Sequence, residues 1–134
     1  MTDDFGDEAT LSRTGQYRHS NAVALWQEIL QSEGLYSGAI DCDFGPGTEA
    51  ATKAYQSRYK LGVDGVVGPQ TWSWADNKLV NEGAYESPQW ETVYYSSNYG
   101  GSPIFRRLTS NGYYQLYLPS GGYWVTAFDN YASC

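Results

Sequence analysis

The sequence predicts an α+β protein, in which a three-helix module precedes a small antiparallel β-meander. Residues 19–80 carry apolar side chains at helical spacing, with loop signals between the periodic runs. Residues 84–134 instead resemble short strands rich in tyrosine, separated by pairs of glycines. Residues 1–18 form an acidic N-terminal tail without either period, so we expect it to lie against its own domain or a neighbouring subunit. A length of 134 residues suits one ordinary domain or two very small ones.

Three helices are expected in the module at 19–80. In NAVALWQEILQSEG the apolar residues follow helical spacing, Ser20 or Asn21 can cap the start, and Gly34 can end the helix. A second helix runs through TEAATKAYQSRYK, and a short third helix covers PQTWSWADNKL. We expect five large side chains of these helices to be buried together, namely Trp26, Ile29, Leu30, Tyr55 and Trp72.

Two loops of this module share one pattern. Residues 40–48 read IDCDFGPGT, and residues 63–71 read VDGVVGPQT. The aspartate of each copy can accept hydrogen bonds from loop N–H groups, and the proline suits a first helical turn because its missing N–H costs nothing there. The threonine of each copy is expected to bond exposed N–H groups of that turn. The matched pairs are Asp41 with Asp64, Pro46 with Pro69, and Thr48 with Thr71.

The segments WQEIL, GLYSGAIDCDFGPGTEAATKAYQ and LGVDGVVGPQTW have the motif order of a known family. On these motifs, residues 23–79 resemble the peptidoglycan-binding domain of bacterial and phage cell-wall hydrolases, a three-helix module. By motif position, the resemblance implies a ligand cleft near the two loops and the first helix, lined by Tyr36, Asp41, Asp43, Phe44, Thr48 and Gln56. One departure is Cys42, because the family usually has glycine after the first aspartate. A positive φ there would strain Cys42 unless the loop has been rebuilt.

The region at 84–134 is expected to form three or four antiparallel strands, from ETVYYSS, SPIFRRLT, YYQLYLP and YWVTAFD, with a hairpin turn at Asn111-Gly112. An isolated small sheet is marginal in water, so its apolar face should pack on the helical module. The tyrosine-rich face suits plain strand formation, contact with another protein, or stacking on sugar rings. As a protein interface, its exposed side would include Tyr113, Tyr117 and some of Tyr94, Tyr95 and Tyr99.

The formal net charge of −7 argues against non-specific nucleic-acid binding and against a polybasic membrane-surface protein. No apolar run is long enough to span a bilayer, and the acidic N-terminus lacks the basic start and apolar stretch of a secretory signal. We therefore expect an extracellular, cell-wall or virion location, reached as part of a secreted protein or by another route such as phage lysis.

We predict no catalytic site, no metal site and no cofactor. His19 is the single histidine and is expected at the surface or as a capping residue, whereas a catalytic zinc typically takes histidine among three protein ligands. No Ser-His-acid or Cys-His signature is visible. The run from Asp41 to Asp43 faintly resembles a calcium loop, but Thr52 stands where an EF-hand needs a bidentate glutamate.

The chain has two cysteines, Cys42 in the first repeat loop and Cys134 at the last position. An even count in an extracellular protein suggests a disulfide. Such a bridge would close a loop of roughly ninety residues, for which the chain-entropy model gives about 4 kcal/mol. Two unrelated thiols are the alternative.

Three functions follow from these observations. The first is a non-catalytic module that binds peptidoglycan or another cell-wall glycan, secreted or carried on a phage particle. The second is a virion structural protein, such as a capsid decoration or tail component, which would use this fold for assembly with other virion or surface subunits or for host attachment. The third is a small cell-wall hydrolase, since sequence alone leaves paired carboxylates open.

Overall fold

The computed structural model describes residues 10–85, 87–96, 104–108, 114–118 and 123–126. Three helices come first in the chain: α1 (Asn21–Ser32), α2 (Pro46–Arg58) and α3 (Pro69–Asp76). Five strands follow: β1 (Leu79–Tyr85), β2 (Ser87–Tyr95), β3 (Ile104–Leu108), β4 (Tyr114–Leu118) and β5 (Tyr123–Thr126). This order confirms the predicted α+β class with a helical part before a β part.

The five strands form one antiparallel sheet in the order β1-β2-β3-β4-β5, which is a meander. The described strands number five, one more than the four segments named from the sequence, because β1 was not predicted. The pairing of β1 with β2 is irregular, with register shifts between Asn81 and Gly83 and between Ala84 and Tyr85. The predicted hairpin turn at Asn111-Gly112 lies outside the described residues.

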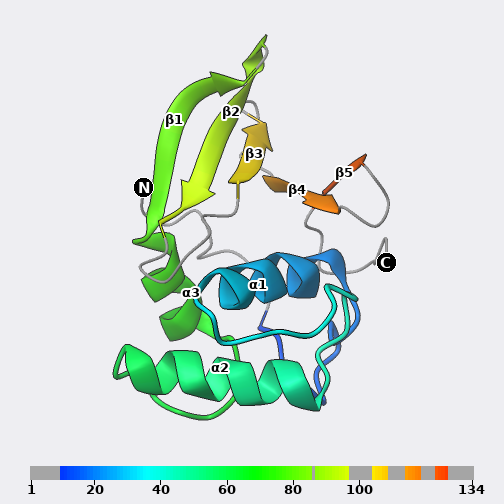
Figure 1. Ribbon diagram of the computed structural model, residues 1–134, viewed down its shortest axis with the longest axis vertical. Helices are drawn as coiled ribbons and strands as arrows, with labels where there is room; N and C mark the ends of the chain where they lie inside the picture. The colour runs from blue at the N-terminus through cyan, green and yellow to red at the C-terminus, as the bar shows by residue number, and fades with distance from the viewer. Residues whose placement is uncertain (1–9, 86, 97–103, 109–113, 119–122, 127–134) are drawn as a thin grey trace.

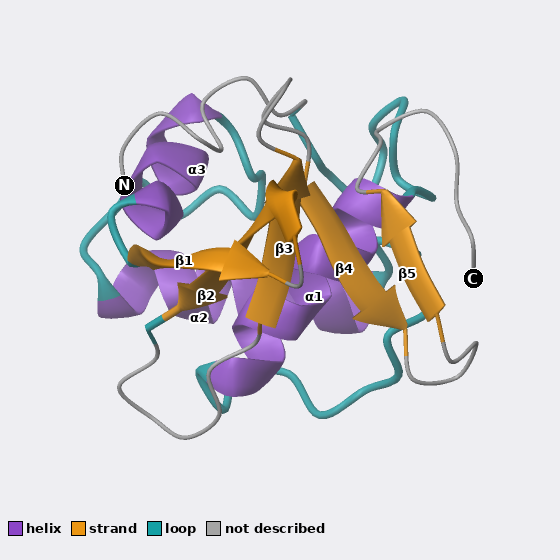
Figure 2. Ribbon diagram, turned by 90° about the horizontal axis from the view of Figure 1, so that it is seen from above, coloured by secondary structure: helices purple, strands orange, loops and turns teal. Residues whose placement is uncertain are grey.

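The sheet lies over α1, and α2 lies on the opposite side of α1 (Figures 1 and 2). The core between these layers contains all five of the large side chains expected there, each at most 1% exposed: Trp26, Ile29, Leu30, Tyr55 and Trp72. The Trp26 ring meets Tyr55 and Trp72 edge-on, with centroid distances of 5.0 and 5.5 Å. Leu79, Val93, Tyr95 and Phe105 from the sheet join the same cluster of buried residues.

The ends of α1 and α2 follow local capping rules. Ser20 is the N-cap of α1, and its Oγ accepts a hydrogen bond from the Val23 N–H at 3.3 Å. At the other end Gly34 has φ 72°, and the Leu35 N–H bonds the Leu30 carbonyl at 3.0 Å, which is a Schellman ending. The same pattern ends α2, where Lys60 has φ 58°. The prolines at the starts of α2 and α3 occupy the first helical positions, as predicted.

The described part of the acidic tail is built into the helical module. Leu11 is fully buried in the core and forms an antiparallel bridge with Val67, with N···O distances of 3.1 and 2.8 Å in the two directions. Farther along, the Arg18 carbonyl accepts a hydrogen bond from the Phe44 N–H at 2.7 Å. The sequence left open whether this tail lies against its own domain or a neighbouring subunit. Residues 10–18 lie against their own domain.

Candidate functional site

The first loop, residues 40–48, is organised by a glutamine that projects from α1. Gln27 is fully buried, and its Nε2 lies 2.9 Å from Asp41 Oδ1, 3.0 Å from the Asp43 carbonyl oxygen and 3.0 Å from Thr48 Oγ1. Its Oε1 accepts hydrogen bonds from the backbone N–H groups of Asp41 and Cys42, at 3.2 and 3.3 Å. Because both ends of one amide are used, Gln27 fixes the path of the loop and the position of the Asp41 carboxylate.

The second loop, residues 63–71, repeats this arrangement around Gln56 of α2. The Gln56 Nε2 lies 3.0 Å from Asp64 Oδ1, 2.9 Å from the Val66 carbonyl oxygen and 3.1 Å from Thr71 Oγ1. Its Oε1 accepts from the N–H groups of Asp64 and Gly65, at 3.2 and 3.0 Å. The sequence repeat therefore encodes one hydrogen-bonded frame that is built twice, each time around a buried glutamine of the preceding helix.

The two aspartates behave as the sequence predicted, and the two threonines do not. Asp41 Oδ1 accepts from the Asp43 N–H at 3.0 Å, and Asp64 Oδ1 accepts from the Val66 N–H at 2.9 Å. Hydrogen bonds from the Val66 N–H and the Gln56 amide lower the pKa of Asp64. Instead of bonding N–H groups of the first helical turn, the described hydroxyls of Thr48 and Thr71 accept from the glutamine side chains. The threonines were misassigned because the partner lies far away in the sequence.

Cys42 differs from its counterpart in the second loop. Cys42 has φ 62°, and the matching Gly65 has φ 73°. Cys42 therefore has the positive φ that the sequence analysis named as a source of strain, because a residue with a Cβ occupies a conformation that favours glycine. Cys42 is fully buried and disulfide-bonded, whereas its predicted partner, Cys134, lies outside the described residues.

The six predicted ligand residues fall into two groups. Tyr36, Asp41 and Asp43 surround Gln27 with part of each residue at the surface, and the Tyr36 hydroxyl donates to the Ala39 carbonyl at 2.6 Å. Burial raises the pKa of Tyr36. The other three are buried: Phe44 lies in the core, Thr48 bonds Gln27, and Gln56 organises the second loop. Their burial gives them a structural role, and ligand contact through them stays a prediction.

The predicted tyrosine interface changes at one position. Tyr95 is fully buried, so it is not on an exposed face of the sheet. The Tyr95 side chain instead points toward the helices, where its hydroxyl contacts Glu33 and Tyr55. Tyr94 is half-buried, whereas Tyr99, Tyr113 and the side chain of Tyr117 lie outside the described residues, and the interface stays a prediction for them.

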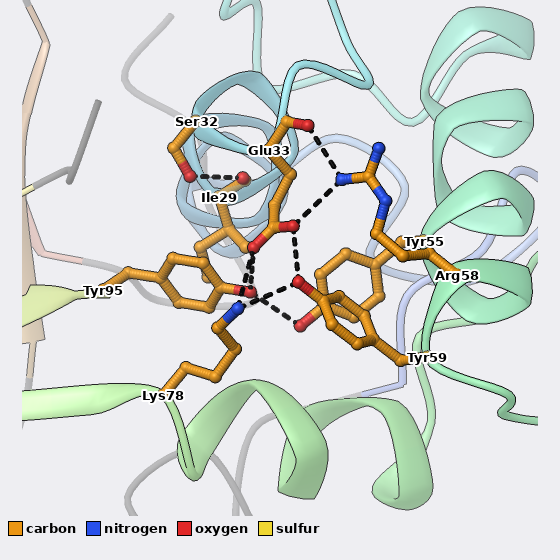
Figure 3. A network of polar contacts seen from close by, with 8 residues as sticks. All are labelled: Ile29, Ser32, Glu33, Tyr55, Arg58, Tyr59, Lys78 and Tyr95. Carbon is orange, nitrogen blue, oxygen red and sulfur yellow. Dashed lines mark hydrogen bonds and ion pairs between the residues drawn. The ribbon is translucent and has the colours of Figure 1, made fainter. Parts of the chain in front are cut away.

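Beneath the sheet, Tyr95 belongs to a buried polar cluster that the sequence did not reveal (Figure 3). At its centre is the carboxylate of Glu33, whose side chain is 0% exposed. Glu33 accepts hydrogen bonds from Arg58 Nη1 at 3.1 Å, Tyr59 OH at 2.6 Å, Lys78 Nζ at 3.2 Å and Tyr95 OH at 2.9 Å. The Tyr55 hydroxyl lies 2.8 Å from that of Tyr95. We call these residues the Glu33 cluster: Glu33, Tyr55, Arg58, Tyr59, Lys78 and Tyr95.

The Glu33 cluster joins the end of α1 to α2, to the segment between α3 and β1, and to β2. Burial alone would raise the pKa of Glu33, but hydrogen bonds from Tyr59 and Tyr95 and the positive charge of Lys78 outweigh it and lower this pKa. Burial raises the pKa of Tyr55 and of Tyr95, so both phenols stay protonated and can donate. The cluster is closed inside the protein and suits a structural role.

A comparison with protein families matches the part of the chain that contains the two Gln-centred frames. Residues 19–74 match the family model of the putative peptidoglycan binding domain. This match confirms the resemblance predicted from the sequence. The matched segment therefore contains both loops, both glutamines and the three helices up to Trp74, whereas Leu11, Lys78 and the whole sheet lie outside it.

Two curated relatives are similar to part of the chain. The N-acetylmuramoyl-L-alanine amidase CwlM of Mycobacterium tuberculosis is 42% identical over 53 residues, which is 40% of this chain and 13% of the relative. The zinc D-Ala-D-Ala carboxypeptidase of Streptomyces albus G is 51% identical over 35 residues, which is 26% of this chain and 14% of the relative. The chain thus spans about one seventh of each relative. No solved structure matches the chain significantly.

The described residues were also searched for other kinds of site. No group of three or more His, Cys, Asp or Glu side chains among them is arranged to hold a metal ion. Within the same residues, no helix combines the length and apolar character needed to cross a bilayer. His19 is exposed, in keeping with the surface position expected for it.

Proposed function

We propose that this chain binds peptidoglycan without acting on it, and that the first loop carries the contact surface. The observation that carries this proposal is the match of residues 19–74 to the putative peptidoglycan binding domain. Both curated relatives bear the names of enzymes of cell-wall chemistry, and each is similar to part of this chain. Binding to the wall is the function common to these observations, and it implies a location at the bacterial cell wall.

The exposed groups of the first loop suit a ligand made of sugars and short peptides. The Asp41 carboxylate uses Oδ1 inside the loop, and the residue is otherwise exposed. Carboxylate oxygens accept hydrogen bonds from sugar hydroxyls and from peptide N–H groups. Tyr36 adds a half-buried aromatic ring whose apolar face can stack on a sugar ring, while its hydroxyl is held by Ala39. Because Gln27 fixes the loop before binding, little ordering of the protein is needed.

The proposal of a non-catalytic role has separate support. The chain has a single histidine, and residues 19–74 match a family described as a binding domain. The chain spans about one seventh of each curated relative, so catalytic groups of those enzymes need not be sought in the shared segment. We therefore propose that any hydrolase linked to this chain acts elsewhere, and that this chain supplies attachment.

Sedimentation with purified peptidoglycan sacculi tests the proposal directly. The intact protein should pellet with the sacculi and should release neither reducing sugar nor new amino termini. The variant with Asp41→Asn and Asp43→Asn keeps the size of both side chains and should stay largely in the supernatant. Asp64→Asn is the control, because it replaces the aspartate of the second loop that matches Asp41 and should leave pelleting unaltered.

Other outcomes would overturn the proposal. A folded protein that never pellets with sacculi would favour the alternative of a virion or surface-assembly subunit. Turnover of peptidoglycan that disappears on substitution of one carboxylate would make the chain a hydrolase. Equal losses from the first-loop and second-loop variants would move the contact surface away from the first loop.

A further inference from the structure

The N-terminal segment brings an arginine to the edge of the first loop. The Arg18 carbonyl accepts a hydrogen bond from the Phe44 N–H at 2.7 Å, and the Ser20 N–H bonds the Cys42 carbonyl at 2.9 Å. The residue between Arg18 and Ser20 forms an antiparallel bridge with the same loop. Three consecutive residues of the segment are therefore paired with three of the loop, so the backbone of Arg18 is fixed there independently of its side chain.

The same segment pairs with both loops at equivalent positions, but with different side chains. It bonds Phe44 in the first loop and the matching Val67 in the second. Leu11 makes the contact with the second loop and is fully buried, whereas Arg18 makes the contact with the first and its side chain is 52% exposed. A valine in the second loop takes the position that Asp43 has in the first. The two loops therefore differ here, with opposite charges at the first and apolar side chains at the second.

We propose that the Arg18 guanidinium binds a ligand carboxylate, so that the first loop takes the short peptides of peptidoglycan rather than its sugars; this inference rests on the proposed function. Arg18 Nη2 lies 3.5 Å from Asp43 Oδ1, which is a long contact between two partly exposed side chains. Exposed pairs of this kind contribute little to stability. Because a guanidinium has five N–H donors, one such contact leaves donors for both oxygens of a ligand carboxylate.

The charges around the first loop suit a peptide better than an uncharged sugar. Asp41 is exposed and can accept hydrogen bonds from peptide N–H or ammonium groups, while Arg18 can donate to a peptide carboxylate. An N-acetylated sugar ring has neither charge. The net charge of −7 would repel an anionic peptide, so a cation fixed beside the loop is needed to bring the carboxylate there. Opposite charges on one surface therefore give the loop a preference for a ligand with complementary charges.

Calorimetric titration of the intact protein with three soluble probes tests this assignment. The probes are a disaccharide-peptide fragment of the wall with a free C-terminal carboxylate, the same fragment with that carboxylate amidated, and an uncharged oligomer of N-acetylglucosamine. The protein should bind the acid about tenfold more tightly than the amide, as expected when a charge-assisted hydrogen bond is lost, and should bind the sugar oligomer most weakly. Sodium chloride should reduce the preference for the acid, because the charges are exposed. Equal affinities for acid and amide would overturn the inference.

Variants of two arginines assign the preference to one side chain. Arg18→Gln removes the charge but keeps the backbone bond to Phe44, so it should melt at the wild-type temperature and bind acid and amide equally. Arg18→Lys keeps the charge without the planar fork and should retain part of the preference. Arg13→Gln is the matched control, because Arg13 lies in the same segment, is 50% exposed and contacts Glu49 at 3.7 Å. It should keep the full preference, and a preference that survives Arg18→Gln would contradict the proposal.

Failure of this inference and failure of the proposed function give different results. If the wild type pellets with sacculi but binds acid and amide equally, attachment to the wall stands and the role of Arg18 fails. Tightest binding of the N-acetylglucosamine oligomer would likewise assign the loop to the sugar strand and overturn the inference alone. If the wild type neither pellets with sacculi nor binds any probe, the proposed function fails and the inference fails with it.

Discussion

The hydroxyl of Tyr95 on β2 donates a 2.9 Å hydrogen bond to the carboxylate of Glu33, which caps the C-terminal end of α1. This contact joins the sheet to the helical module through a fully buried acid. Two cationic side chains, Arg58 and Lys78, approach the same carboxylate to 3.1 and 3.2 Å. The attachment of the β-meander to the helical module therefore depends on a charged centre as well as on apolar packing.

Substitution of Glu33 by glutamine should destabilise the protein strongly. The change removes the negative charge and leaves Lys78, whose side chain is 13% exposed, beside a neutral amide. Breaking one partner of a buried ion pair typically costs about 3–5 kcal/mol, and we expect the free energy of unfolding to fall within that range in urea titrations. Glu49→Gln is the matched control. Glu49 pairs with the exposed Arg13 at 3.7 Å, so its loss should cost less than about 1 kcal/mol.

The stability of the protein should also be sensitive to acid because of the Glu33 carboxylate. The pKa of Glu33 is lowered from its ordinary value of 4.5, so its contribution to stability is complete above that value and is lost as pH falls through the folded-state pKa. Thermal midpoints of the wild type should therefore drop below pH 4.5, and those of Glu33→Gln should drop less steeply. Parallel slopes in the two proteins would remove Glu33 as a source of acid sensitivity.

Glu28 should give the stability of the protein the opposite dependence on pH. Burial on α1 raises the pKa of Glu28 from 4.5 to about 8. Between those values the folded state holds a proton that the unfolded state has released, so this residue lowers stability as pH rises. Glu28→Gln should raise the thermal midpoint at pH 8 and change it little at pH 4. An equal gain at both values would instead indicate a packing effect that does not depend on titration.

The two buried glutamines make a matched pair for separating fold from binding. Gln27→Ala and Gln56→Ala each leave loop groups without partners, so each should destabilise the protein by about 1–3 kcal/mol. If the first loop contacts the wall, Gln27→Ala should also weaken pelleting with sacculi at a temperature where both variants are folded. Equal pelleting by the two variants would contradict the assignment of the surface to the first loop.

The aromatic core gives a prediction that depends on no ligand. Trp26 is fully buried between Tyr55 and Trp72, and its Nε1 donates to Thr52 Oγ1 at 2.9 Å. Trp26→Ala should lower the free energy of unfolding by about 3–5 kcal/mol. An unchanged midpoint in thermal denaturation would show that the neighbouring rings do not depend on Trp26.

Local signals predicted the helical half of the fold well. The serine at position 20, the glycine at position 34 and the first-turn prolines act within a few residues of their own positions, so the sequence neighbourhood contains the whole interaction. The paired Asp-Gly-Pro-Thr punctuation was likewise visible as a repeat. The repeat did not reveal the glutamine at the centre of each frame. Gln27 and Gln56 lie on the preceding helix and look like ordinary polar helix residues.

The missed features depend on contacts between distant segments. Glu33 has partners at positions 58, 59, 78 and 95, and nothing local distinguishes it from an exposed helix-end acid. Strand β1 contains LVNEGAY, in which asparagine and glycine weaken the strand signal, and it is stabilised by pairing with β2. Leu11 is an isolated apolar residue in a polar segment, so no period could reveal its burial. In each case the deciding energy comes from tertiary packing.

The bridge between Leu11 and Val67 determines how a mechanical load would enter the module. A pull applied to the chain before residue 10 must first break the two backbone hydrogen bonds at Leu11 and draw its side chain out of the core. Only then would tension reach Arg18, whose carbonyl accepts a hydrogen bond from the Phe44 N–H in the first loop. We therefore expect a force applied there to disturb the second loop, through Val67, before it disturbs the first loop, through Phe44.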